Sequence, residues 1–114
     1  MTEVVSEYYT RLTEERAHLL VQIERLREDV KIEVEFEADE GDPELPERER
    51  NLSLLATFEE RLTDLDRALD KLKDGNYGIC KSCGNPIDPE RLAIVPETEY
   101  CVTCKSKLER RSRR

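Results

Sequence analysis

Apolar residues recur along the first part of the chain at alternating steps of four and three positions. This heptad spacing places one apolar seam along a helix and is typical of a coiled coil. Arg16 is one polar interruption, and no Gly or Pro occurs before Gly41 to break the helix. We therefore predict a long first helix whose seam consists of Val5, Tyr9, Leu12, Leu19, Ile23, Leu26 and Val30.

A second seam with the same spacing lies in the middle of the chain. Pro46 with the acids that follow it is typical of a helix start, and Asp74-Gly75 supplies a C-terminal stop. The steps of three and four again predict a helix with one apolar stripe. The positions of this seam are Leu55, Phe58, Leu62, Leu65, Leu69 and Leu72.

The two predicted helices, Val5–Ile32 and Glu47–Asp74, are equally long, at roughly 40 Å each. Matched arms joined by a short turn favour an antiparallel coiled-coil hairpin within one chain. A dimer through the same seams is the competing arrangement, and the turn makes it the weaker one. We therefore expect a monomer.

The turn between the arms contains conflicting signals. Ile32, Val34 and Phe36 alternate with glutamates, which indicates a locally extended exit from the first arm or a frayed helix end. Gly41 and Pro43 disfavour a regular helix further on. We predict a tip loop at about residues 33–46.

The tip is the most acidic part of the chain, with eight Asp and Glu from Ile32 to Glu47 inclusive and no Lys or Arg. A run of charge usually forms a solvated loop. The alternative is an acidic tip directed at a metal ion or a basic channel, because carboxylates are ligands suited to Mg²⁺. The candidate tip residues are Asp39, Glu40, Asp42 and Glu44.

All four cysteines lie in one stretch with the spacing C-x2-C-x17-C-x2-C, namely Cys80, Cys83, Cys101 and Cys104. Two such pairs can surround one zinc ion with four thiolates in a closed tetrahedron. A closed site has no position for water or substrate, so we predict a structural zinc. Two disulfides, a redox pair and an iron–sulfur cluster are weaker alternatives for these residues.

The stretch around the cysteines predicts a small module. Asn85-Pro86, Asp88-Pro89 and Pro96 indicate turns between short extended pieces. We expect a C-terminal helix with a basic end after Cys101. The residues expected to form a core under the zinc are Ile87, Leu92, Ile94 and Val95.

Composition limits the fold class. With 40% charged residues and no Trp, the chain has too little apolar material for a large core. We therefore predict a mainly α protein: a two-helix coiled-coil hairpin in residues 1–76, and a four-cysteine zinc finger at its base with a C-terminal basic helix in residues 77–114. The formal charge is −8, with −11 in the first of these segments and +3 in the second.

Charge and hydropathy also exclude several functions. An acidic body disfavours general binding to DNA phosphates, which needs clustered Lys and Arg. The first residues have no basic and apolar leader pattern, and no apolar run is long enough to cross a membrane. We expect a cytoplasmic protein without a membrane segment. No nucleophile–base pattern indicates an enzyme.

The pattern around the cysteines is more specific than their spacing. It reads Tyr77-Gly78-x-Cys80-x-x-Cys83-Gly84-x-x-Ile87-x-x-x-Arg91-Leu92-x-x-x-Pro96, followed by Cys101-x-x-Cys104. This pattern resembles the zinc finger of the DksA/TraR family of bacterial transcription factors. The resemblance implies a hairpin that enters the secondary channel of RNA polymerase, with an acidic tip acting near the catalytic Mg²⁺ and without specific DNA binding.

Two departures from the family pattern are visible. The family tip has the form Asp-x-x-Asp-x-Ala, and here Asp39 and Asp42 match the acids while Glu44 stands at the Ala. Members that respond to guanosine tetraphosphate carry a basic residue before the finger proline, where this chain has Val95; Lys105 matches. We therefore expect no nucleotide response.

Two hypotheses from different classes follow. The first is a non-enzymatic regulator that binds RNA polymerase. The second is a zinc-stapled coiled-coil adaptor that binds another protein through its seams or finger. A zinc finger that binds nucleic acid directly is a distant third, and it would show steep salt-dependent DNA binding.

Overall fold

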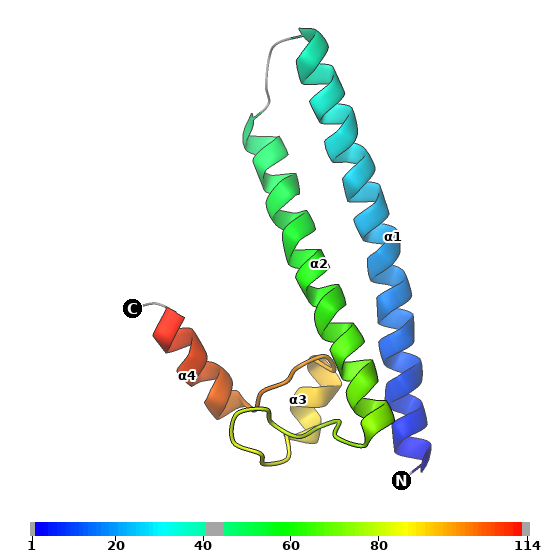
Figure 1. Cartoon of the computed structure of the whole chain (residues 1–114), viewed down its shortest axis with the longest axis vertical. Coiled ribbons are helices and arrows are strands. Elements are labelled where there is room, and N and C mark those ends of the chain that lie inside the picture. The colour runs from blue at the N-terminus through cyan, green and yellow to red at the C-terminus, as the bar shows by residue number, and fades with distance from the viewer. Residues whose placement is uncertain (1, 41–44, 113–114) are drawn as a thin grey trace. The chain divides into compact units, whose positions relative to one another are not determined.

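The computed structural model describes residues 2–40 and 45–112, and these are mainly helical (Figure 1). Apart from one isolated antiparallel bridge between Ile79 and Pro86, the described residues form no β-structure. No helix in the described ranges is long and apolar enough to cross a membrane. The helices are α1 (Thr2–Glu40), α2 (Leu45–Asp74), α3 (Pro89–Ile94) and α4 (Val102–Ser112).

The predicted fold class is confirmed: a two-helix coiled-coil hairpin carries a four-cysteine module and a C-terminal helix. Contacts group the chain into two compact units. One unit takes the first thirteen residues together with the chain from Asp64 onward, and the other is Glu14–Thr63. The predicted domain division after residue 76 stays a prediction.

In the unit Glu14–Thr63, α1 and α2 run side by side in opposite directions (Figure 1). The seam residues Leu19 and Ile23 are almost fully buried, as the heptad spacing predicted. Two salt bridges flank the seam, from Arg27 to Glu59 and from Arg61 to Glu15, each at 2.8 Å. Because these pairs are partly exposed, they add little stability and the apolar seam carries most of it.

In the other unit, the paired ends of α1 and α2 pack against each other and against the finger. Leu12 and Leu65 are fully buried, and Ala68, which the predicted seam omitted, is buried beside them. The prediction of Tyr9 in the seam is wrong, because this side chain is 50% exposed. Its neighbour Tyr8 turns inward instead and packs against the core of the finger.

The first helix continues further than the sequence pattern indicated. α1 extends through Glu40, so the extended exit at residues 32–36 is wrong. The segment lacks Gly and Pro, and a helix already formed needs no new nucleus to continue through residues of moderate propensity. With α2 beginning at Leu45, the predicted tip loop of residues 33–46 is too long, and residues 41–44 lie outside the described part.

The end of α2 forms as its sequence predicts. Gly75 has a φ of +79°, and the Asn76 N–H donates to the Lys71 carbonyl at 2.9 Å. This bond and the left-handed glycine form a Schellman cap, which satisfies carbonyls at the helix end. The cap turns the chain out of α2 and directly into the cysteine module.

We expect Leu65→Ala to lower the free energy of unfolding by about 2–5 kcal/mol, because it leaves a cavity in a fully buried layer. Urea unfolding followed by circular dichroism measures this change. Leu52→Ala is the control, since Leu52 lies on the same helix with 41% of its surface exposed. Equal losses in the two variants would show that the seam does not carry the stability of the hairpin.

Candidate metal centre

The first cysteine pair lies in a tight hairpin held by backbone hydrogen bonds. The Cys80 N–H donates to the Asn85 carbonyl at 2.8 Å, and the Ile87 N–H donates to the Gly78 carbonyl at 2.7 Å. The Gly84 N–H closes the turn on the Cys80 carbonyl at 2.9 Å. Gly84 has a φ of +76°, which explains why glycine follows the pair. The turn brings the sulfurs of Cys80 and Cys83 to one side.

The second pair lies at the start of α4. Cys101 directly precedes the helix and Cys104 lies in its first turn. The Cys104 N–H points at the Cys101 sulfur over 3.5 Å, and the Lys105 N–H donates to the Cys101 carbonyl at 2.9 Å. One free amide group of the helix start therefore faces the Cys101 sulfur.

The four thiols lie close together. Their sulfur atoms are all within 4.8 Å of one another, and the Cys83 and Cys101 sulfurs are 4.0 Å apart. A tetrahedral zinc with Zn–S bonds of about 2.3 Å needs sulfur separations of about 3.8 Å, so a small contraction completes the site. Cys80 and Cys104 are buried and Cys83 is exposed. Four sulfurs around one point leave no place for a substrate.

The thiols differ in acidity because their surroundings differ. Burial alone would raise the pKa of Cys80, but the backbone N–H groups of Cys83, Cys101 and Ser82 lower it to about 6. Contact with the Cys101 sulfur, followed by burial, raises the pKa of Cys104 to about 12. A metal ion that binds at neutral pH must therefore displace a proton from Cys104, so binding weakens as the pH falls.

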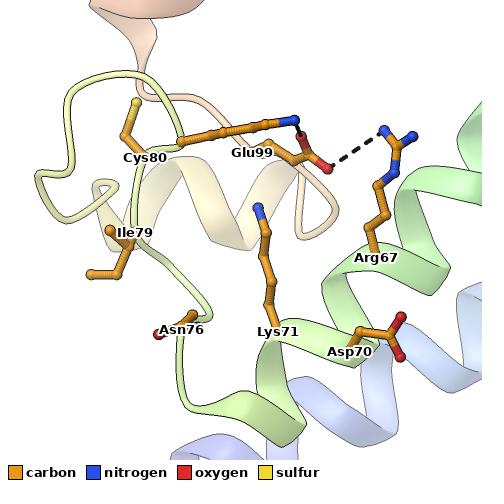
Figure 2. A pocket seen from close by; sticks show the side chains of 8 residues that line it. Arg67, Asp70, Lys71, Asn76, Ile79, Cys80 and Glu99 are labelled. Atoms are coloured by element: carbon orange, nitrogen blue, oxygen red, sulfur yellow. Dashed lines mark ion pairs between the residues drawn. The ribbon is translucent and has the colours of Figure 1, made fainter.

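The two cysteine pairs are joined through Glu99, which sequence reasoning missed. The Lys81 N–H donates to the Glu99 carbonyl at 2.8 Å. The Glu99 side chain is only 10% exposed and lies between the Lys81 ammonium at 3.6 Å and the Arg67 guanidinium of α2 at 3.8 Å (Figure 2). These three charges line a cavity of about 430 Å³ that Lys71, Ile79 and Cys80 also border. Glu99 therefore connects the finger to α2.

A short helix, α3, lies between the two pairs, where the sequence analysis expected turns and extended pieces. Asp88 caps it by accepting a hydrogen bond from the Glu90 N–H at 2.9 Å, and Pro89 occupies its first position. The Asp-Pro-Glu sequence is a helix-start signal that could have identified it. The helix buries Leu92 but leaves Ile94 79% exposed, so the prediction of Ile94 in the core is wrong.

The residues of the finger pattern have visible structural roles. The Tyr77 hydroxyl donates to the carbonyl of the fully buried Pro96 at 2.8 Å. The Arg91 guanidinium donates to the Tyr100 carbonyl at 2.9 Å and so fixes the backbone segment that directly precedes the second cysteine pair. The buried cluster itself consists of Cys80, Ile87, Leu92 and Cys104, with Tyr8, Tyr77, Tyr100 and Cys101 packed against it. Predicting Ile87 and Leu92 as core residues was correct.

The remaining predicted site residues fall into two groups. Asp39 and Glu40 form the last positions of α1, while Asp42 and Glu44 lie outside the described residues. Val95 and Lys105 come together at a cavity of about 170 Å³. The same cavity is bordered by Arg91 and by three acids, Asp64, Glu97 and Glu99.

Fold and site together define a helical zinc-finger protein, in which paired helices carry a four-cysteine module. The family described as prokaryotic dksA/traR C4-type zinc finger matches residues 75–110. Residues 75–110 therefore form a zinc finger of the DksA/TraR family, and its metal is zinc.

Curated relatives extend the similarity beyond the finger. The RNA polymerase-binding transcription factor DksA of Caulobacter vibrioides is 35% identical over 83 residues, which are 71% of this chain and 58% of the relative. The protein of the same name from Salmonella typhimurium is 28% identical over 99% of this chain and 77% of its own length. The chain therefore spans less than two thirds of the Caulobacter relative.

Two solved structures share the fold. Transcription factor DksA2 from Pseudomonas aeruginosa matches with a TM-score of 0.80 and 28% identity, over 96% of this chain and 86% of its own. A Chlamydia trachomatis protein described as the RNA polymerase binding protein and transcriptional regulator Dks matches with a TM-score of 0.56 and 24% identity, over 96% and 92% of the two chains. The second likeness concerns the fold alone.

We expect the purified, reduced protein to contain one zinc per chain, and Cys83→Ser to lose most of it because one thiolate is removed from a four-sulfur site. Elemental analysis measures the metal. The seam residues of the unit Glu14–Thr63 should keep their helicity in circular dichroism.

Ser82→Ala is the matched control, since Ser82 lies between the same two cysteines and offers no sulfur. Full zinc content in Cys83→Ser, or zinc loss in Ser82→Ala, would contradict this ligand set.

Proposed function

We propose that this chain is a bacterial transcription regulator that binds RNA polymerase directly and inserts its coiled-coil tip into the secondary channel. The observation that carries the proposal is the likeness to transcription factor DksA2 over 96% of the chain. The Caulobacter and Salmonella relatives, which are named for binding RNA polymerase, support the same partner.

The paired helices suit a narrow channel. α2 alone has 30 residues, so it is roughly 45 Å long, and two packed helices are about 20 Å across. The tip residues Asp39, Glu40, Asp42 and Glu44 supply negative charge without a neighbouring base between Lys31 and Arg48. Carboxylates near a catalytic Mg²⁺ would change its ligand shell or the charge balance around it.

The zinc has a structural role in this proposal, with Cys80, Cys83, Cys101 and Cys104 as its ligands. Four thiolates fill a tetrahedral shell and leave no position at which a substrate could react. We therefore infer a protein without enzymatic activity. Reduced thiol ligands and a polymerase partner both favour the cytoplasm as its compartment.

The alternative function is a zinc-stapled adaptor that binds another protein. A pull-down with bacterial core polymerase separates the two, because the adaptor has no reason to retain it. Specific DNA binding is not part of either function, since the body of the protein is acidic.

We also infer that guanosine tetraphosphate has little effect on this protein. The position before Pro96 is Val95, which supplies no charge for a phosphate. In the cavity that Val95 and Lys105 share, Asp64, Glu97 and Glu99 would repel a polyphosphate. The Arg91 guanidinium there already donates to the Tyr100 carbonyl.

We expect the protein to be a monomer, because both seams are covered within one chain. Leu19, Ile23 and Leu65 are already buried without a second copy. Light scattering at micromolar concentration should give a mass near the 13.3 kDa of a single chain. A stable mass twice as large, reduced to one chain by Leu62→Asp, would favour pairing between chains.

We expect Asp42→Asn to change transcription from a sensitive promoter while binding to polymerase stays close to that of the parent. Asp42 occupies an acidic position of the family tip pattern, and the substitution removes its charge with almost no change in size. Transcription in vitro and a polymerase pull-down measure the two properties.

Glu60→Gln is the control, because Glu60 is an exposed acid on α2 away from the tip. If Asp42→Asn and a fully neutralised tip both regulate as the parent does, the tip acts only as a spacer. If the parent fails to bind polymerase, the adaptor function replaces this one.

A further inference from the structure

A polar pair interrupts the apolar seam of the unit Glu14–Thr63 close to the tip. On α1 the seam steps from Val30 to Glu33, and on α2 it steps back from Leu55 to Asn51. The heptad spacing would place apolar residues at both positions. The Asn51 side-chain amide donates to a Glu33 carboxylate oxygen at 2.7 Å, so the two positions face each other across the arms.

The Glu33–Asn51 pair stabilises the hairpin less than two apolar residues at these positions would. Glu33 and Asn51 are both partly buried, and the second Glu33 carboxylate oxygen is buried without a hydrogen-bond partner in the described structure. A buried polar oxygen without a partner costs free energy, whereas two packed apolar residues would not. Polar pairs of this kind are often neutral or destabilising relative to apolar replacements. Stability therefore does not explain the pair.

The alignment of α1 against α2 gives a reason for a polar pair at these positions. A slide by one heptad brings seam positions opposite seam positions again, so the apolar layers by themselves favour the present alignment only weakly. The Glu33–Asn51 hydrogen bond can form in one alignment alone, because a one-heptad slide separates the two groups by about 10 Å along the helices. Among the described cross-arm pairs, Arg27–Glu59 and Arg61–Glu15 are exposed enough to rearrange at little cost.

We propose that the Glu33–Asn51 pair is a positioning element that fixes the register of α1 against α2 below the tip. Glu33 is seven residues from the end of α1, and Asn51 is six residues from the start of α2. Each is therefore within about two helical turns of the tip. The consequence for transcription rests on the proposed function, because the register determines where the acidic tip residues lie in the channel.

The test replaces the pair by Glu33→Leu/Asn51→Leu. Spin labels on unnatural side chains at the exposed positions 21 and 50, which lie at different heights along the two arms, report the register and leave the four cysteines to zinc. The parent should give one narrow distance distribution. The double variant should show an equal or higher melting temperature together with a second population, displaced along the helix by about 10 Å for a one-heptad slip. The separate variant Glu33→Gln keeps Asn51, and its amide oxygen can still accept the hydrogen bond. It should therefore show the single population of the parent.

Glu35→Leu/Ser53→Leu is the matched control, since it replaces one acid and one neutral polar residue at neighbouring exposed positions. It should keep the parent distribution. A single parent-like distribution in Glu33→Leu/Asn51→Leu would overturn the proposal, and so would a second population in the control.

Transcription gives the second measurement. The double variant should bind polymerase and lose the tip-dependent effect on a sensitive promoter, while Glu33→Gln should retain it. A shifted register with unchanged regulation would show that the pair does not position the tip. The label distances need no polymerase, so a parent that fails to bind polymerase contradicts the proposed function and leaves the register result to stand alone.

Discussion

The convergence of four sulfur atoms is the constraint on which the finger depends, because the chain around them has little else to bury. Two of the four side chains in its buried cluster are the thiols of Cys80 and Cys104. Without a metal, ionised thiolates at this separation would repel one another, whereas a divalent cation turns the same geometry into the strongest contact of the module. The surrounding tyrosines extend that contact outward. The rings of Tyr8 and Tyr77 lie 4.9 Å apart between centroids, so the zinc cluster also holds the beginning of α1.

Features that depend on the spacing of residues along the chain could be predicted from the sequence. Which of two adjacent, similar side chains becomes buried could not be predicted. Alternating steps of three and four identified the buried Leu19, Ile23 and Leu65, because a helix repeats its faces regularly. Tyr8 and Tyr9 are equivalent by composition, and the position of Tyr77 in space decides which of them is buried. The alternation at residues 32–36 indicated a locally extended chain or a frayed helix end, but the cooperativity of a helix already formed outweighed it.

The site divides in the same way. The paired CxxC spacing identified the four sulfurs that the structure brings within 4.8 Å, since two short turns suffice to place them. Glu99 carries no comparable signal, because its cations come from α2 and from the first turn of the finger, 32 and 18 positions earlier. The Glu33–Asn51 pair lies between these cases. Its heptad positions follow from the spacing of the seams, but the hydrogen bond requires the alignment of two arms, which the seams leave open.

Stability and alignment are therefore supplied by different residues. Apolar layers contribute free energy in proportion to buried area, and their heptad spacing lets them contribute it in more than one register. A zinc cluster specifies geometry because its ligands must meet at bond distance, and it acts on the ends of the arms that its tyrosines touch. The four zinc ligands lie outside Glu14–Thr63, so the alignment of α1 against α2 there has to be fixed by other groups. Polar side chains can do this, because their burial is unfavourable unless they form a hydrogen bond with each other. A carboxylate and an amide at seam positions meet this condition, and they do so close to the acidic residues whose location matters most for the proposed function.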